Sequence, residues 1–134
     1  MRTKLAAFVI CVVLFSITVP IFAHHSFAVD YDVKKPVKLQ GVVTKVEWTN
    51  PHAHVYVDVV ENGVKSNWNF EMASPNILER NGWSRKSLNI NDQVTVEGFS
   101  GRVVSTRGII TSITLPDGRA LFAGAGPAAD SPQQ

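Results

Sequence analysis

Hydrophobic and polar residues alternate along most of the chain after residue 36, as they do in β-strands that bury one face. The clearest case is His52–Val60, where every second residue from Ala53 to Val59 is apolar and the residues between them are polar. Similar segments predict four more strands, at residues 37–48, 66–72, 93–99 and 109–115. Gly41 and the two valines after it predict a bulge or strong bend in the first of these strands.

A single short helix is predicted between the third and fourth strands. Ser74 is a candidate N-cap, Pro75 fits the first helical position, and Gly82 ends the segment. Three strands, a helix and two more strands are the order of an OB-type, five-stranded Greek-key barrel, in which the helix covers one end. A short segment at 119–122 follows the last strand. The alternative fold is a small antiparallel β-sandwich.

The first 23 residues differ in character from the rest of the chain. A positively charged start at residues 1–4 precedes an apolar run from 5 to about 17, and Pro20 and Ala23 follow as a helix breaker and a small residue. This order is typical of a secretory signal peptide, so we expect cleavage after Ala23 and export to a bacterial periplasm. An uncleaved membrane anchor is the alternative, because the segment approaches the ~20 residues that span a bilayer.

The charge balance changes when this leader is set aside. The chain has 13 Lys+Arg and 11 Asp+Glu, and two of the basic residues, Arg2 and Lys4, lie in the leader. The remainder is neutral, with 11 basic and 11 acidic residues, which argues against nucleic acid as a partner. The only cysteine, Cys11, also lies in the leader. The exported protein would therefore have no thiolate and no second apolar run able to span a membrane.

The expected domain organisation has four parts. Residues 1–23 are the signal peptide, 24–36 an N-terminal segment, and 37–122 the OB-like domain. Residues 123–134 are rich in Ala, Gly, Pro, Ser and Gln, which predicts a disordered tail.

The four histidines fall into two close groups and are the strongest candidates for chemistry. After cleavage, His24 would be the N-terminus, and its amine and imidazole could chelate one metal ion next to His25. His52 and His54 are two residues apart, so on a strand they share a face with Cα atoms ~7 Å apart. Several neutral nitrogens suit Cu(II), and also Zn(II) in a tetrahedral site. A polar strand face without metal is the alternative.

A metal-independent function is also open. Trp48 stands at the end of a predicted strand, while Tyr56 and Glu71 lie on polar strand faces. These three residues could recognise a protein, peptide or glycan partner, whereas Trp68 and Trp83 are expected to fill the core. No serine lies in a nucleophile-elbow pattern and no glycines form a phosphate-binding loop, so an enzyme is the least supported class and no catalytic residue is assigned.

Four motifs resemble those of a known family: AHHSF at 23–27, EWTNPHA at 47–53, FEMASPN at 70–76 and TLPDGR at 114–119. The family consists of small secreted bacterial proteins, common in proteobacteria, and is catalogued as a domain of unknown function. The resemblance implies a small exported β-rich domain and supplies no activity. His24, His25 and His52 match the pattern of the family, whereas His54 stands where the family has an aromatic residue.

Overall fold

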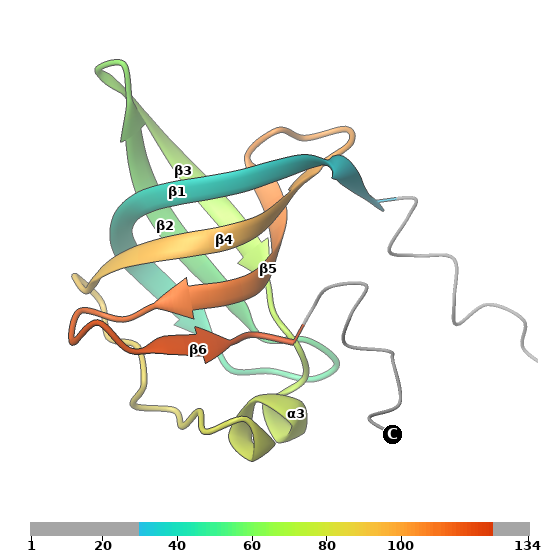
Figure 1. Cartoon of the computed structure of the whole chain (residues 1–134), viewed down its shortest axis with the longest axis vertical. Coiled ribbons are helices and arrows are strands. Elements are labelled where there is room, and N and C mark those ends of the chain that lie inside the picture. The colour runs from blue at the N-terminus through green and yellow to red at the C-terminus, as the bar shows by residue number, and fades with distance from the viewer. Residues whose placement is uncertain (1–29, 125–134) are drawn as a thin grey trace, which may run out of the picture.

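The computed structural model describes residues 30–124. The predicted signal peptide, His24, His25 and nearly all of the predicted tail lie outside the described residues. Within them, the chain forms six strands and one short helix, which confirms the mainly-β class (Figure 1). Their bounds are β1 Tyr31–Glu47, β2 His54–Glu61, β3 Val64–Glu71, α3 Pro75–Arg80, β4 Gln93–Gly101, β5 Arg107–Thr114 and β6 Ala120–Phe122. The sixth strand, one more than expected, forms from the short segment at 119–122.

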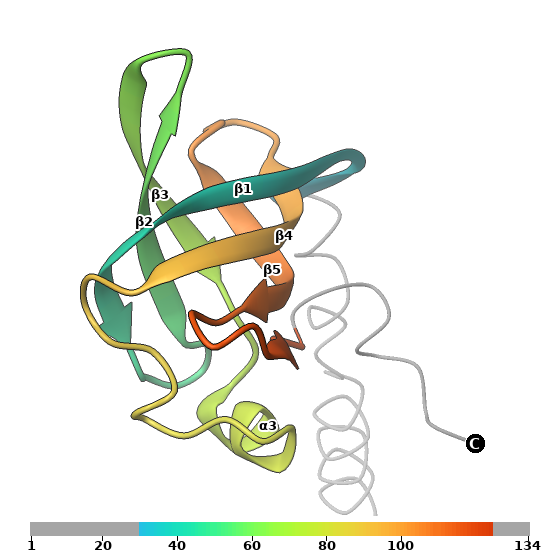
Figure 2. The ribbon, with the colours of Figure 1, turned by 60° about the vertical axis from the view of Figure 1, so that its left-hand side comes forward.

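The strands join in one sheet whose pairings form a cycle. β1 pairs antiparallel with both β2 and β4, β2 continues to β3, and β4 continues to β5. A short parallel contact between β3 and β5 links the two ends, with Phe70 opposite Gly108, and β6 adds to β5. Each of the first four strands therefore has two neighbours and β5 has three, and the sheet curls around a single core (Figure 2).

β1 is the longest strand, with 17 residues, and it begins at Tyr31 instead of residue 37. Residues 31–36 are therefore part of the sheet and not a separate N-terminal segment. The predicted irregularity near Gly41 is present slightly later, as a register shift between Val43 and Lys45. Gly41 itself lies so close to the Asp58 carbonyl and the Val57 side chain that no Cβ would fit. The glycine allows β1 and β2 to approach each other where the sheet bends.

The core follows the predicted alternation. Ala53, Val55, Val57 and Val59 are all at most 1% exposed, as their pattern requires. Trp68 and Trp83 are buried, which confirms their predicted core role, and Trp68 stacks on Phe70 with ring centroids 5.3 Å apart. β2 begins at His54, two residues later than predicted, because Ala53 bonds through its backbone to Met72 and Ala73 beyond the end of β3.

α3 begins at Pro75 as predicted and lies below one end of the curled sheet (Figures 1 and 2). The Ser74 side chain makes no capping hydrogen bond; instead its backbone carbonyl accepts from the N–H groups of Ile77 and Leu78. Leu78 is fully buried and anchors this six-residue helix to the core. No helix within residues 30–124 is long and apolar enough to cross a membrane.

The ordered domain continues slightly past the predicted boundary at residue 122. Ala123 is fully buried, donates to the Thr111 carbonyl and accepts from the Ala73 N–H at 2.8 Å. These two backbone bonds join Ala123 to the domain although its composition resembles that of the tail.

Candidate functional site

His52 lies just before β2, in a turn that contains the cis Asn50–Pro51 bond. Its Nδ1 is 3.1 Å from the Met72 carbonyl oxygen and 3.4 Å from Glu71 Oε1. A carbonyl oxygen can only accept, so the contact with Met72 places a proton on Nδ1, and in the neutral ring the lone pair is then at Nε2. The side chain is 48% exposed, which leaves an imidazole that is held on one side and open on the other.

His54 is held in a similar way by different partners. Its Nδ1 lies 3.0 Å from Asn69 Oδ1, and the Asn69 amide donates to the Tyr56 hydroxyl at 3.4 Å. An acceptor at Nδ1 again leaves Nε2 as the free nitrogen. His52 precedes β2 and His54 is its first residue, with the buried Ala53 between them, so the predicted alternation continues through both histidines. Each ring is held by its own partners.

Tyr56 takes part in this network through its hydroxyl and its ring. The hydroxyl donates to Glu47 Oε2 at 3.1 Å, and Lys45 Nζ lies 5.0 Å from the ring centroid. Burial, followed by the Glu47 carboxylate, raises the pKa of Tyr56. The hydrogen bond from Lys45, followed by the one from Tyr56, lowers the pKa of Glu47. The Tyr56 hydroxyl, a group predicted to contact a partner, is thus already hydrogen-bonded within the chain.

Glu71 connects His52 to the start of β1. Its Oε2 accepts a hydrogen bond from the Tyr31 hydroxyl at 2.7 Å, while its Oε1 faces His52. Tyr31 is buried, and this burial, together with the hydrogen bond to Glu71, raises the pKa of Tyr31 above its usual range. The sequence analysis missed Tyr31 because it lies outside the strand pattern that begins at residue 37; an aromatic residue between two aspartates was the only visible signal.

Trp48 is half-buried and packs against the core. Its indole Nε1 is buried and has no hydrogen-bond partner among residues 30–124. Its role as a partner contact stays a prediction.

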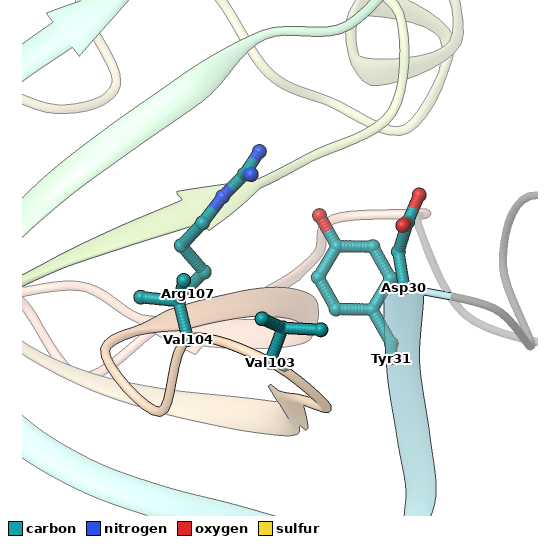
Figure 3. Close-up of a pocket in the computed structure, with 6 residues that line it drawn as sticks. Asp30, Tyr31, Val103, Val104 and Arg107 are labelled. Atoms are coloured by element: carbon teal, nitrogen blue, oxygen red, sulfur yellow. The ribbon is translucent and has the colours of Figure 1, made fainter.

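A small open hollow of about 60 Å³ lies beside Tyr31. It is lined by Asp30, Tyr31, Gly101, Val103, Val104 and Arg107. In Figure 3 the Arg107 side chain and the Tyr31 hydroxyl extend to the same side, with Val103 and Val104 below them. The guanidinium charge acts on the hydroxyl of Tyr31 and opposes the larger effect of burial on its pKa.

The described residues contain no group of three or more His, Cys, Asp or Glu side chains able to hold a metal ion. They do contain two imidazoles, those of His52 and His54, whose Nδ1 atoms have hydrogen-bond partners. A metal bound there would need further ligands, and His24 and His25 lie outside residues 30–124.

A family model described as a family of unknown function, DUF6152, matches residues 12–111. The chain belongs to this family. The match includes the motifs at 23–27, 47–53 and 70–76, and so both histidine groups. Neither the curated proteins nor the solved structures provide a match.

Proposed function

We propose that the protein is an exported periplasmic OB-type barrel that binds Cu(II) or Zn(II) through its N-terminal histidines and His52. The barrel assignment is supported by the cycle of strand pairings and by α3, which follows the third strand and covers one end. Export is supported by the leader, and cleavage after Ala23 would make the amine of His24 available.

The observation that carries the metal site is the chain of contacts from Tyr31 through Glu71 to His52. Tyr31 is 2.7 Å from Glu71, and the other carboxylate oxygen of Glu71 is 3.4 Å from His52. Only the side chain of Glu71 therefore lies between His52 and Tyr31, the first residue of β1. His25 is six residues before Tyr31, and six extended residues span at most about 20 Å. The two histidine groups, 27 residues apart in sequence, are within reach of one another.

The environment of His52 fits a ligand of a transition metal. Histidines that bind metals commonly donate their second ring N–H to a carbonyl or carboxylate, which fixes the ring and increases its basicity. Nδ1 of His52 has both kinds of acceptor, from Met72 and Glu71. The amine and ring of His24 with Nε2 of His52 would supply three nitrogens, a set that suits Cu(II). His25 and His54 are the candidates for a fourth.

Calorimetric titration with Cu(II) and Zn(II) tests the proposal. The protein that begins at His24 is compared with a form in which the amine of His24 is acetylated, and with His52→Ala. We expect each change to weaken Cu(II) binding by about 100-fold, since each removes a nitrogen ligand. Thr49→Val is the matched control: its hydroxyl lies 3.3 Å from the His52 carbonyl, so it changes the same turn without removing a nitrogen. Equally weak binding by all forms would contradict the proposal.

A binding module without metal is the alternative. It needs no free amine at His24, so acetylation of that amine would leave partner binding unchanged. We favour the metal site because the polar atoms of Tyr56 and Glu71, two of the candidate contacts, are already used in hydrogen bonds within the chain.

A further inference from the structure

Three exposed valines gather at the end of the domain where β1 begins. Val103 is 92% exposed, and Val33 and Val104 are each 46% exposed. Val103 and Val104 belong to the loop between β4 and β5, while Val33 lies near the start of β1. Apolar side chains that lie in the open at one place, next to charged ones, are typical of an interaction surface.

The two segments lie side by side although about 70 residues separate them. Tyr31 is opposite Gly101 and Pro36 opposite Phe99, and the register is irregular between these pairs. The backbone N–H of Arg102 donates to the Asp30 carbonyl at 2.9 Å. The segment 32–35 therefore bulges beside the loop 102–106, and Figure 3 shows Val103 next to Asp30 and Tyr31.

The valines are surrounded by positive charge. We call the set Val33, Lys34, Lys35, Arg102, Val103, Val104 and Arg107 the entry patch, because the chain enters the domain there. Its four basic residues and the two carboxylates of the adjoining segment, Asp30 and Asp32, give a net charge of +2. Arg102 is paired with Asp32 at 3.9 Å, whereas Lys34, Lys35 and Arg107 form no ion pair within the described part of the chain.

We propose that the entry patch docks on the surface of an anionic lipid bilayer. Exposed apolar side chains enter the boundary between headgroups and acyl chains, and surrounding Lys and Arg are attracted to the lipid phosphates. The hollow beside Arg107 combines an apolar wall, formed by Val103 and Val104, with a positive charge. A protein partner is less well matched, because the exposed apolar residues of the patch are valines and not the aromatic anchors that dominate protein interfaces.

The position of the patch in the chain agrees with this. The apolar run at residues 5–17 ends thirteen residues before Asp30 in the sequence. The entry patch is thus the part of the domain nearest in sequence to the segment that would insert into the membrane during export. The proposal is independent of the metal site, since none of its residues is a proposed ligand.

Sedimentation with lipid vesicles tests the proposal, using the protein as cells export it and with EDTA present to remove metal. We expect binding to vesicles of equal parts phosphatidylglycerol and phosphatidylcholine, little binding to pure phosphatidylcholine, and loss of binding at 0.5 M NaCl. The double change Val103→Ser with Val104→Ser should weaken binding about tenfold. Lys34→Ser with Lys35→Ser should weaken it by a similar factor.

Ile90→Ser is the matched control. Ile90 is 63% exposed and near Arg85 and Lys86 in sequence, but it precedes β4, whereas Val103 follows it. Its substitution should leave vesicle binding unchanged. The proposal would be overturned if the protein bound neither kind of vesicle or bound both equally well. It would also be overturned if Ile90→Ser weakened vesicle binding as much as the double valine change.

Discussion

Gly108 is the position where the cycle of strands closes, and its substitution tests that closure. It lies opposite Phe70 on β3 and Ser100 on β4, so it is in contact with both neighbours of β5. A Cβ at this position would be 2.6 Å from the Phe70 ring and 3.0 Å from the Phe99 carbonyl oxygen. Gly108→Ala therefore places a methyl group between β3 and β5, where there is no room for it.

The expected magnitude follows from these distances. The Phe70 ring would have to withdraw by about 0.8 Å, from 2.6 Å to an ordinary contact of 3.4 Å. Phe70 is fully buried and stacked on Trp68, so it has no free space into which to move. Overpacking of this kind costs about 1–3 kcal/mol in unfolding free energy.

Urea unfolding of a double-mutant cycle measures the effect. Phe70→Leu alone is expected to cost about 1 kcal/mol or more, because it shortens a buried side chain. In the Gly108→Ala background the same change gives the new methyl group space, so its cost should fall by at least about 1 kcal/mol. Additive effects, or a Gly108→Ala variant as stable as the parent, would refute the close contact of β3 with β5.

Three further results are expected. Burial raises the pKa of Tyr31 above 10.0, so at high pH the folded state keeps a proton that the unfolded state loses. The free energy of unfolding should therefore decline as the pH rises above about 10, and it should decline less in Tyr31→Phe. Equal pH profiles of the two proteins in urea unfolding would contradict this. The hydrogen bond from Lys65 lowers the pKa of Asp58, so carbon-detected NMR titration should show that pKa rising in Lys65→Met, and an unchanged pKa would contradict this contact. Trp83 donates to a backbone carbonyl at 2.9 Å, whereas the buried Trp68 indole N–H has no partner within residues 30–124. Trp83→Phe should therefore cost about 1 kcal/mol more than Trp68→Phe in thermal or urea unfolding.

Local patterns in the sequence predicted the elements well. The alternation along β2 was visible because a strand with one buried face repeats every two residues. The start of α3 was visible at Ser74–Pro75, since proline at the first helical position loses no hydrogen bond.

The contacts that build the candidate site join distant parts of the chain and have no local signal. Tyr31 and Glu71 are 40 residues apart, and their hydrogen bond depends on how far β1 extends toward its N-terminus. His52 is held by the backbone carbonyl of Met72. Every residue has such a carbonyl, so the sequence does not show which one binds the ring. Trp48 was equally ambiguous, because an aromatic residue at the end of a strand can turn either toward the core or toward solvent.

Pulsed EPR of Cu(II) bound to the protein that begins at His24 tests the metal site most directly, because it detects the remote nitrogen of each bound imidazole. We predict coupling to at least two imidazoles, and one imidazole fewer in His52→Ala. An identical spectrum in the parent protein and in His52→Ala would show that His52 does not bind the ion and would contradict the proposed function.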